Sequence, residues 1–112
     1  MRPLLVLVMA CAFLPAAAAA ETRWTFCVAS AAETRDVWIS EVFAAGADRE
    51  RLEDEFKAAI TRASANRVVA QCPAPKDDKT EAINDRFVAE EFNRKLDADI
   101  HAFSSQQFPP RR

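Results

Sequence analysis

Two neighbouring stretches of the chain, RWTFCVAS at residues 23–30 and VWISEVF at residues 37–43, have the pattern of β-strands. In the first, Trp24, Phe26 and Val28 alternate with smaller or more polar side chains, which is the period of two typical of a half-buried strand. The second is almost entirely apolar, so we expect a central, buried strand. Together they predict a β-sheet near the start of the folded region.

A helix is expected after these strands, beyond Gly46, the only glycine of the chain. Asp48 is a typical N-cap residue, and Asn66 is suited to end the helix. Between them, apolar side chains recur at the spacing of one helix face. They are Leu52, Phe56, Ala59, Ile60 and Ala63. This spacing predicts an amphipathic helix that covers the sheet.

The second half of the chain predicts a short strand at residues 67–71, ended by two prolines, and then a second helix. Asp78 and Glu81 have the spacing of a capping box at the start of that helix. Its apolar face is expected to consist of Ile83, Phe87, Val88, Phe92 and Leu96. The step from Phe87 to Phe92 is five residues, so the apolar stripe drifts around the helix instead of forming one straight face.

Residues 99–108 predict a last strand, although an extension of the second helix would also fit this stretch. The expected fold is therefore a small α+β domain of order β-β-α-β-α-(β). It has two helices and a mainly antiparallel sheet of three to four strands, with one helix covering one face of the sheet. We expect one domain over residues 21–108. The tail 109–112 contains two prolines and is expected to be disordered.

The N-terminal residues have the three parts of a secretory signal peptide. Arg2 gives a positive start, residues 4–14 form an apolar run, and residues 16–20 are all alanine. The run is shorter than the roughly 20 residues that a membrane-spanning helix needs. We expect residues 1–20 to be a signal peptide, with Cys11 inside the part that is removed, and the mature chain to have no membrane span.

Two cysteines, Cys27 and Cys72, remain after such a cleavage. An even number of cysteines in an exported chain indicates a disulfide, and two cysteines allow one intramolecular pairing. A reactive thiol is the alternative, but the chain has no C-x-x-C motif. The sequence therefore predicts a Cys27–Cys72 bridge that links the first strand to the end of the third.

The arrangement of aromatic residues and cysteines resembles that of small secreted domains of bacterial envelope proteins. The residues that carry the resemblance are Trp24-x-Phe26-Cys27, the strand at residues 37–43, a helix with Phe56, and Ala70-x-Cys72. The resemblance spans most of the mature chain. It implies the same fold and disulfide, and it implies no particular activity.

Composition and motifs exclude several classes of function. One glycine cannot form a dinucleotide fingerprint, a phosphate-binding loop or a nucleophile elbow. The formal net charge of −2 is opposite to that of a nucleic-acid-binding domain, so no nucleic acid is expected as a partner. No cofactor is expected either.

Two groups of residues are candidate sites. Asp97, Asp99 and His101 would share one face of a strand and could form a small metal site, although a solvated polar face is the simpler interpretation. Trp24 and Trp38 are more typical of a core, but they would form a binding patch if both were exposed.

These observations predict an exported, periplasmic or secreted domain without catalytic activity that acts as an accessory or interaction module of the bacterial cell envelope. A protein partner in the envelope is the expected ligand. Two alternatives remain open at this point. One is an inhibitor that docks on a secreted hydrolase, and the other is a small metal-dependent enzyme that uses Asp97, Asp99 and His101.

Overall fold

The structure is a computed structural model that describes residues 22–46, 48–104 and 108. The predictions for the signal peptide at 1–20, for Cys11 and for the tail at 109–112 lie outside the described residues. In the described part of the chain, no helix is long and apolar enough to cross a membrane.

The described chain has six strands and two helices. The strands are β1 (Arg23–Thr25), β2 (Val28–Ala31), β3 (Asp36–Ser40), β4 (Phe43–Ala45), β5 (Val68–Gln71) and β6 (Asp99–Phe103). The helices are α1 (Arg49–Ser64) and α2 (Lys79–Lys95). The predicted α+β class, the two helices and the last strand are confirmed, and β6 ends at Phe103 rather than Phe108.

Each of the first two predicted strands is divided into two, and the pieces form two sheets. Val28 pairs with Ile39, and Thr25 pairs with Phe43. The segment from Ile39 to Phe43 therefore has one more residue than the segment from Thr25 to Val28 that it pairs with. An extra residue of this kind is a β-bulge, which bends the strand and ends regular pairing. At the bend, the Ser40 hydroxyl accepts a hydrogen bond from the Cys27 backbone N–H at 2.9 Å. Beyond it, β1 and β4 form a separate two-stranded ribbon.

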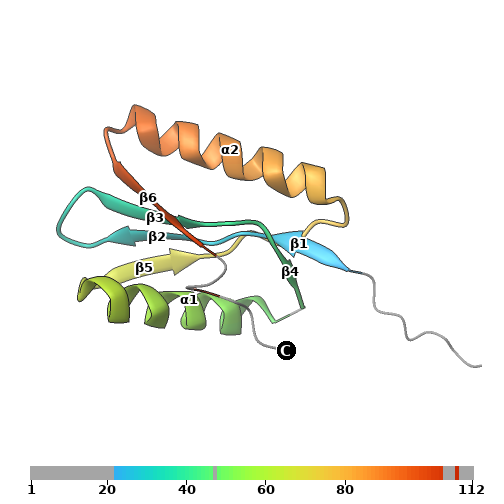
Figure 1. Ribbon diagram of the computed structural model, residues 1–112, viewed down its shortest axis with the longest axis horizontal. Coiled ribbons are helices and arrows are strands. Elements are labelled where there is room, and N and C mark those ends of the chain that lie inside the picture. Colours follow the sequence, from blue (N-terminus) through green and yellow to red (C-terminus); the bar gives the residue numbers. More distant parts are fainter. Residues whose placement is uncertain (1–21, 47, 105–107, 109–112) are drawn as a thin grey trace, which may run out of the picture.

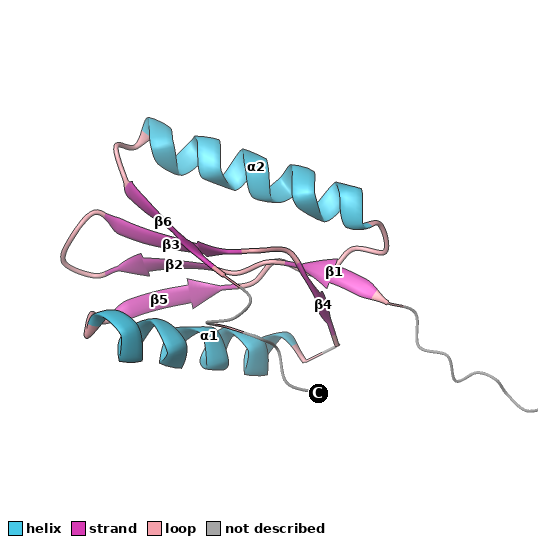
Figure 2. Ribbon diagram, viewed as in Figure 1, coloured by secondary structure: helices cyan, strands magenta, loops and turns pink. Residues whose placement is uncertain are grey.

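The larger sheet has the strand order β5-β2-β3-β6. The pairs β5–β2 and β2–β3 are antiparallel, and β6 is parallel to β3. The helices lie on opposite sides of this sheet (Figure 1), and Figure 2 shows the resulting three layers of helix, sheet and helix. One helix, α1, covers one face as expected, and α2 lies on the opposite face.

The main core lies between α1 and the sheet. Alternation along the strands directs Ala29, Trp38 and Val68 to this side, where they join the buried face of α1. That face consists of Leu52, Phe56, Ala59 and Ile60, as the spacing predicted. Phe103 and Phe108 pack on Phe56 with ring centroids 5.7 and 4.9 Å away. A smaller core on the α2 side contains Phe26, Val37 and Ile39.

Local interactions fix the ends of both helices. The Asp48 carboxylate accepts a hydrogen bond from the Arg51 backbone N–H at 3.1 Å, and the Asp78 carboxylate accepts one from Thr80 N–H at 2.9 Å. Both N-caps were predicted. The C-cap of α1 is Ala65, one residue before the predicted Asn66, and Ala65 lies in the left-handed region at φ 62°.

The predicted disulfide is present between Cys27 and Cys72, which are both buried. It joins the junction of β1 and β2 to the end of β5 across a sequence separation of 45 residues. The loop-entropy relation assigns a stabilisation of about 4 kcal/mol to a loop of this length. Disulfides of this kind are typical of proteins outside the reducing cytosol.

Candidate binding groove

α2 leaves most of its large apolar side chains in contact with solvent. Ala82 is its only buried residue. Ile83, Phe87, Val88, Phe92 and Leu96, the face predicted from the sequence, are between 50% and 63% exposed. The prediction identified the right residues of the helix but assumed that they face the sheet. A set of exposed apolar residues this large on one helix is unusual for a surface without a binding role.

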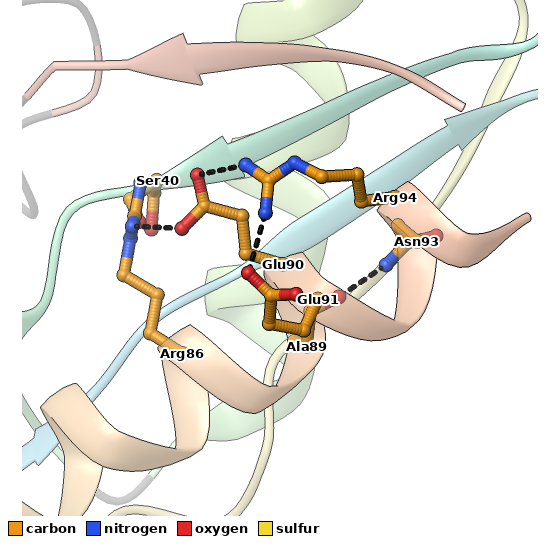
Figure 3. Close-up of polar contacts among 7 residues, drawn as sticks. All are labelled: Ser40, Arg86, Ala89, Glu90, Glu91, Asn93 and Arg94. Atoms are coloured by element: carbon orange, nitrogen blue, oxygen red, sulfur yellow. Dashed lines mark hydrogen bonds and ion pairs between the residues drawn. The ribbon is translucent and has the colours of Figure 1, made fainter. Parts of the chain in front are cut away.

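Arg86 of α2 forms a hydrogen bond with the sheet, and the small Ala89 packs against the core on this side, whereas the other polar contacts lie within the helix. The Arg86 guanidinium donates a hydrogen bond from Nε to the Ser40 carbonyl oxygen at 2.7 Å and lies 3.4 Å from Glu90 (Figure 3). Glu90 and Glu91 both bind Arg94, and Asn93 donates to the Ala89 carbonyl one turn back.

A groove of about 640 Å³ lies between α2 and the part of the sheet that α2 leaves uncovered. α2 packs mainly on β1, β3 and β6, so the α2 side of β2 and β5 remains open. Three segments line the groove: Phe26, Val28 and Ser30; Gln71, Pro73, Ala74 and Lys76; and Asp85, Val88, Ala89, Phe92 and Asn93 of α2. Its volume is within the range of ligand sites in proteins, about 300–1,000 Å³.

The apolar residues of α2 form two flanks, and only one of them faces the groove. Val88 and Phe92 are four residues apart, lie one above the other on the helix surface, and line the groove wall. Ile83 and Phe87 have the same spacing but are not part of the lining. This separation gives two comparable apolar pairs, one inside the site and one outside it.

The charged groups around the groove neutralise one another. The Lys76 ammonium is 2.8 Å from the Asp85 carboxylate, which raises the pKa of Lys76 above its ordinary value. At the far end of β5, Arg67 pairs with Glu33 at 2.8 Å. Each of these charges therefore has an oppositely charged partner, and apolar side chains such as Phe26, Val88 and Phe92 form much of the groove wall.

The two tryptophans have different environments. Trp38 is buried in the main core, as expected, and the His101 ring stacks on it with ring centroids 5.3 Å apart. Trp24 is half-buried in β1, and the Lys79 ammonium lies 4.8 Å from the centre of its ring. They therefore do not form a shared exposed patch.

Among the described residues, Asp97, Asp99 and His101 do not form a group that could hold a metal ion. His101 Nε2 is 2.8 Å from Asp36 Oδ1, and this hydrogen bond, followed by one from the Thr34 hydroxyl, lowers the pKa of Asp36. Asp97 lies in the turn after α2 with φ 62°, and Asp99 is on β6. No group of three potential ligands suited to a metal ion occurs within residues 22–46, 48–104 and 108. Asp36 was missed from the sequence because its contact with His101 requires the parallel pairing of β3 and β6.

The groove was also missed, although the sequence contains a signal for it. The drift of the apolar stripe between Phe87 and Phe92 is the reason why the helix cannot bury all of these residues against one flat sheet. No protein-family model, curated protein or solved structure matches this chain.

Proposed function

We propose that this protein is an exported, non-catalytic interaction domain of the bacterial cell envelope, periplasmic or secreted, which binds an apolar segment of another protein in the α2 groove. The observation that carries the proposal is the exposed Val88–Phe92 pair beside an apolar groove with neutralised charges. Such a surface is suited to binding a ligand through apolar contact.

The energetics of burial support a bound partner. A Phe side chain has about 150–250 Å² of surface, so the 61% exposure of Phe92 leaves on the order of 100 Å² in water. At about 25 cal/mol per Å², covering that surface is worth about 2–3 kcal/mol. Val88 adds to this value, and the pair can act as the centre of an interface.

Export is supported by two independent features of the chain. The N-terminal pattern is that of a secretory signal, and the Cys27–Cys72 disulfide is stable in oxidising compartments such as the periplasm. A protein of the envelope would meet its partner there, in its oxidised form.

The first test compares the two apolar flanks of α2 in the native exporting host. Phe92→Glu changes the groove wall, and Phe87→Glu makes the same change outside it. After crosslinking and purification under denaturing conditions, we expect the wild-type protein and Phe87→Glu to retain the same partner. Phe92→Glu should lose at least 90% of it. Equal retention by both variants, or equal loss, would refute binding in the groove.

A further inference from the structure

We propose that the partner segment binds as an added β-strand along the outer edge of β5, with alternate uncharged apolar side chains pointing into the α2 groove. This inference rests on the proposed function and specifies its partner. The partner is an extended segment of a different protein, not a second copy of this chain.

The backbone of β5 presents unused hydrogen-bonding groups on its outer edge. The Ala32 N–H donates to the Arg67 carbonyl at 2.9 Å, so the backbone hydrogen-bonding groups of Arg67 point toward the β2 side. Backbone groups alternate along a strand, so Val69 and Gln71 also face β2, whereas Val68 and Ala70 face outward. The N–H groups and carbonyls of Val68 and Ala70 have no partner among the described residues. They can form the ladder that a new strand requires.

One neighbouring group on the same edge is already occupied. The Cys72 N–H also points outward by this alternation, and it donates to the Glu53 carboxylate of α1 at 2.9 Å. The open part of the edge therefore ends before Cys72. A segment of about five residues, at about 3.3 Å per residue, would match it.

The two edges of the sheet differ in their protection. β6 carries Asp99 and His101 on its exposed positions, and charged side chains on an edge strand oppose further pairing. β5 has the sequence Val-Val-Ala-Gln, without a charge or a proline. Its Val69 side chain is 64% exposed on the groove side of the sheet. Edges of this composition are suited to accepting another strand.

The groove explains which side chains such a strand would carry. Side chains alternate between the two faces of a strand, so every second residue of the partner would lie on the side of Val69 and the groove. Long apolar side chains at those positions would contact Val69 and reach toward Val88 and Phe92. The charges of Lys76 and Asp85, and those of Arg67 and Glu33, already pair with each other. A charged side chain of the partner would therefore be buried in the groove without an opposite charge, which is unfavourable.

A second copy of the chain fits this surface less well. Pairing of β5 with β5 of another copy would join two sheets edge to edge, but each α2 packs mainly on β1, β3 and β6 of its own copy. Val88 and Phe92 would then remain exposed. Pairing of four-residue strands also buries less than the roughly 800 Å² per partner of a standard interface.

The test selects peptides from a phage-displayed library of random linear octapeptides, using the oxidised protein purified from the periplasm of an expression host. The best peptide is then synthesised and its Kd is measured by fluorescence anisotropy. We expect selected peptides to carry apolar residues at every second position. N-methylation of the backbone positions that face β5 should weaken binding at least tenfold, and N-methylation of the alternate positions should have little effect.

Protein variants provide the matched controls. Val69→Lys places a charge on the edge and should weaken peptide binding at least tenfold, whereas Phe87→Lys, outside the groove, should not. Loss of binding in Phe92→Glu with no effect of either N-methylation would overturn strand addition while leaving the groove function intact. Insensitivity to Phe92→Glu would refute both. Failure to select any peptide, or a homodimer that Val69→Lys dissociates, would overturn the proposed partner.

Discussion

At the scale of single residues, Asp36 shows how one contact links the two parallel strands β3 and β6. Its carboxylate receives the hydrogen bonds of His101 and the Thr34 hydroxyl, and these lower its pKa in the folded protein. In the unfolded chain the group returns to its ordinary value of 3.8. Below that pH the unfolded chain binds a proton at this position before the folded protein does, so the free energy of unfolding falls.

We therefore predict that Asp36→Asn is less stable than the wild type at pH 6, and that the difference becomes smaller as the pH falls below 3.8. Urea unfolding at pH 6, 4 and 3 measures this change. Asp99→Asn is the control, because Asp99 is the register partner of Asp36 and its side chain forms no hydrogen bond or ion pair with the described residues. The same pH dependence in both variants would contradict a stabilising role for the hydrogen bonds to the Asp36 carboxylate.

At the scale of elements, Arg86 attaches α2 to the sheet in addition to the packing of Ala89 against the smaller core. Arg86→Met keeps the apolar stem but removes the hydrogen bond to the Ser40 carbonyl and the pair with Glu90. Bonds of a charged donor contribute about 1.5–3 kcal/mol, and partial exposure of Arg86 to water lowers this value. We predict that amide hydrogen exchange in α2 becomes about tenfold faster, with α1 unchanged.

Arg94→Met is the control for this prediction, because Arg94 pairs with Glu90 and Glu91 on the same helix. It should change exchange in α2 less than Arg86→Met does. Hydrogen–deuterium exchange with mass spectrometry resolves the two helices. If exchange in α1 and α2 rose equally, the unfolding would be global, and Arg86 would not serve as a local attachment.

The elements also show which parts of the fold the sequence predicts. The buried face of α1, both N-caps and the disulfide follow from local spacing and cysteine count, and each is confirmed. The bulge between β3 and β4 is not predictable from local pattern, since residues 37–43 have the composition of one continuous strand with Ser40 and Glu41 inside it. The groove forms where α2 leaves strands uncovered, so it depends on the position of α2 on the sheet. That position follows from the parallel pairing of β6, the strand after α2, with β3. This pairing joins distant parts of the chain and is therefore not visible in the local sequence.

At the scale of the whole molecule, the disulfide is expected to provide a large share of stability. Small domains are stabilised by only about 5–15 kcal/mol in total, and the loop closed by Cys27 and Cys72 accounts for about 4 kcal/mol of it. We predict that the Cys27→Ala, Cys72→Ala double variant loses about 3–5 kcal/mol in urea unfolding. The wild-type protein in reducing agent should lose a similar amount, and unchanged midpoints in both samples would contradict the prediction.

The position of β6 at the end of the chain affects how the molecule is made. β3 carries the buried Val37, Trp38 and Ile39, and one of its two neighbours is β6, which begins at Asp99. At about 5–20 residues per second, the ribosome needs several seconds to progress from β3 to β6. Until β6 is available, β3, which has the most buried residues of any strand, lacks its second neighbour. β6 closes this edge, so the larger sheet is complete only after its last strand has reached the compartment in which the protein folds.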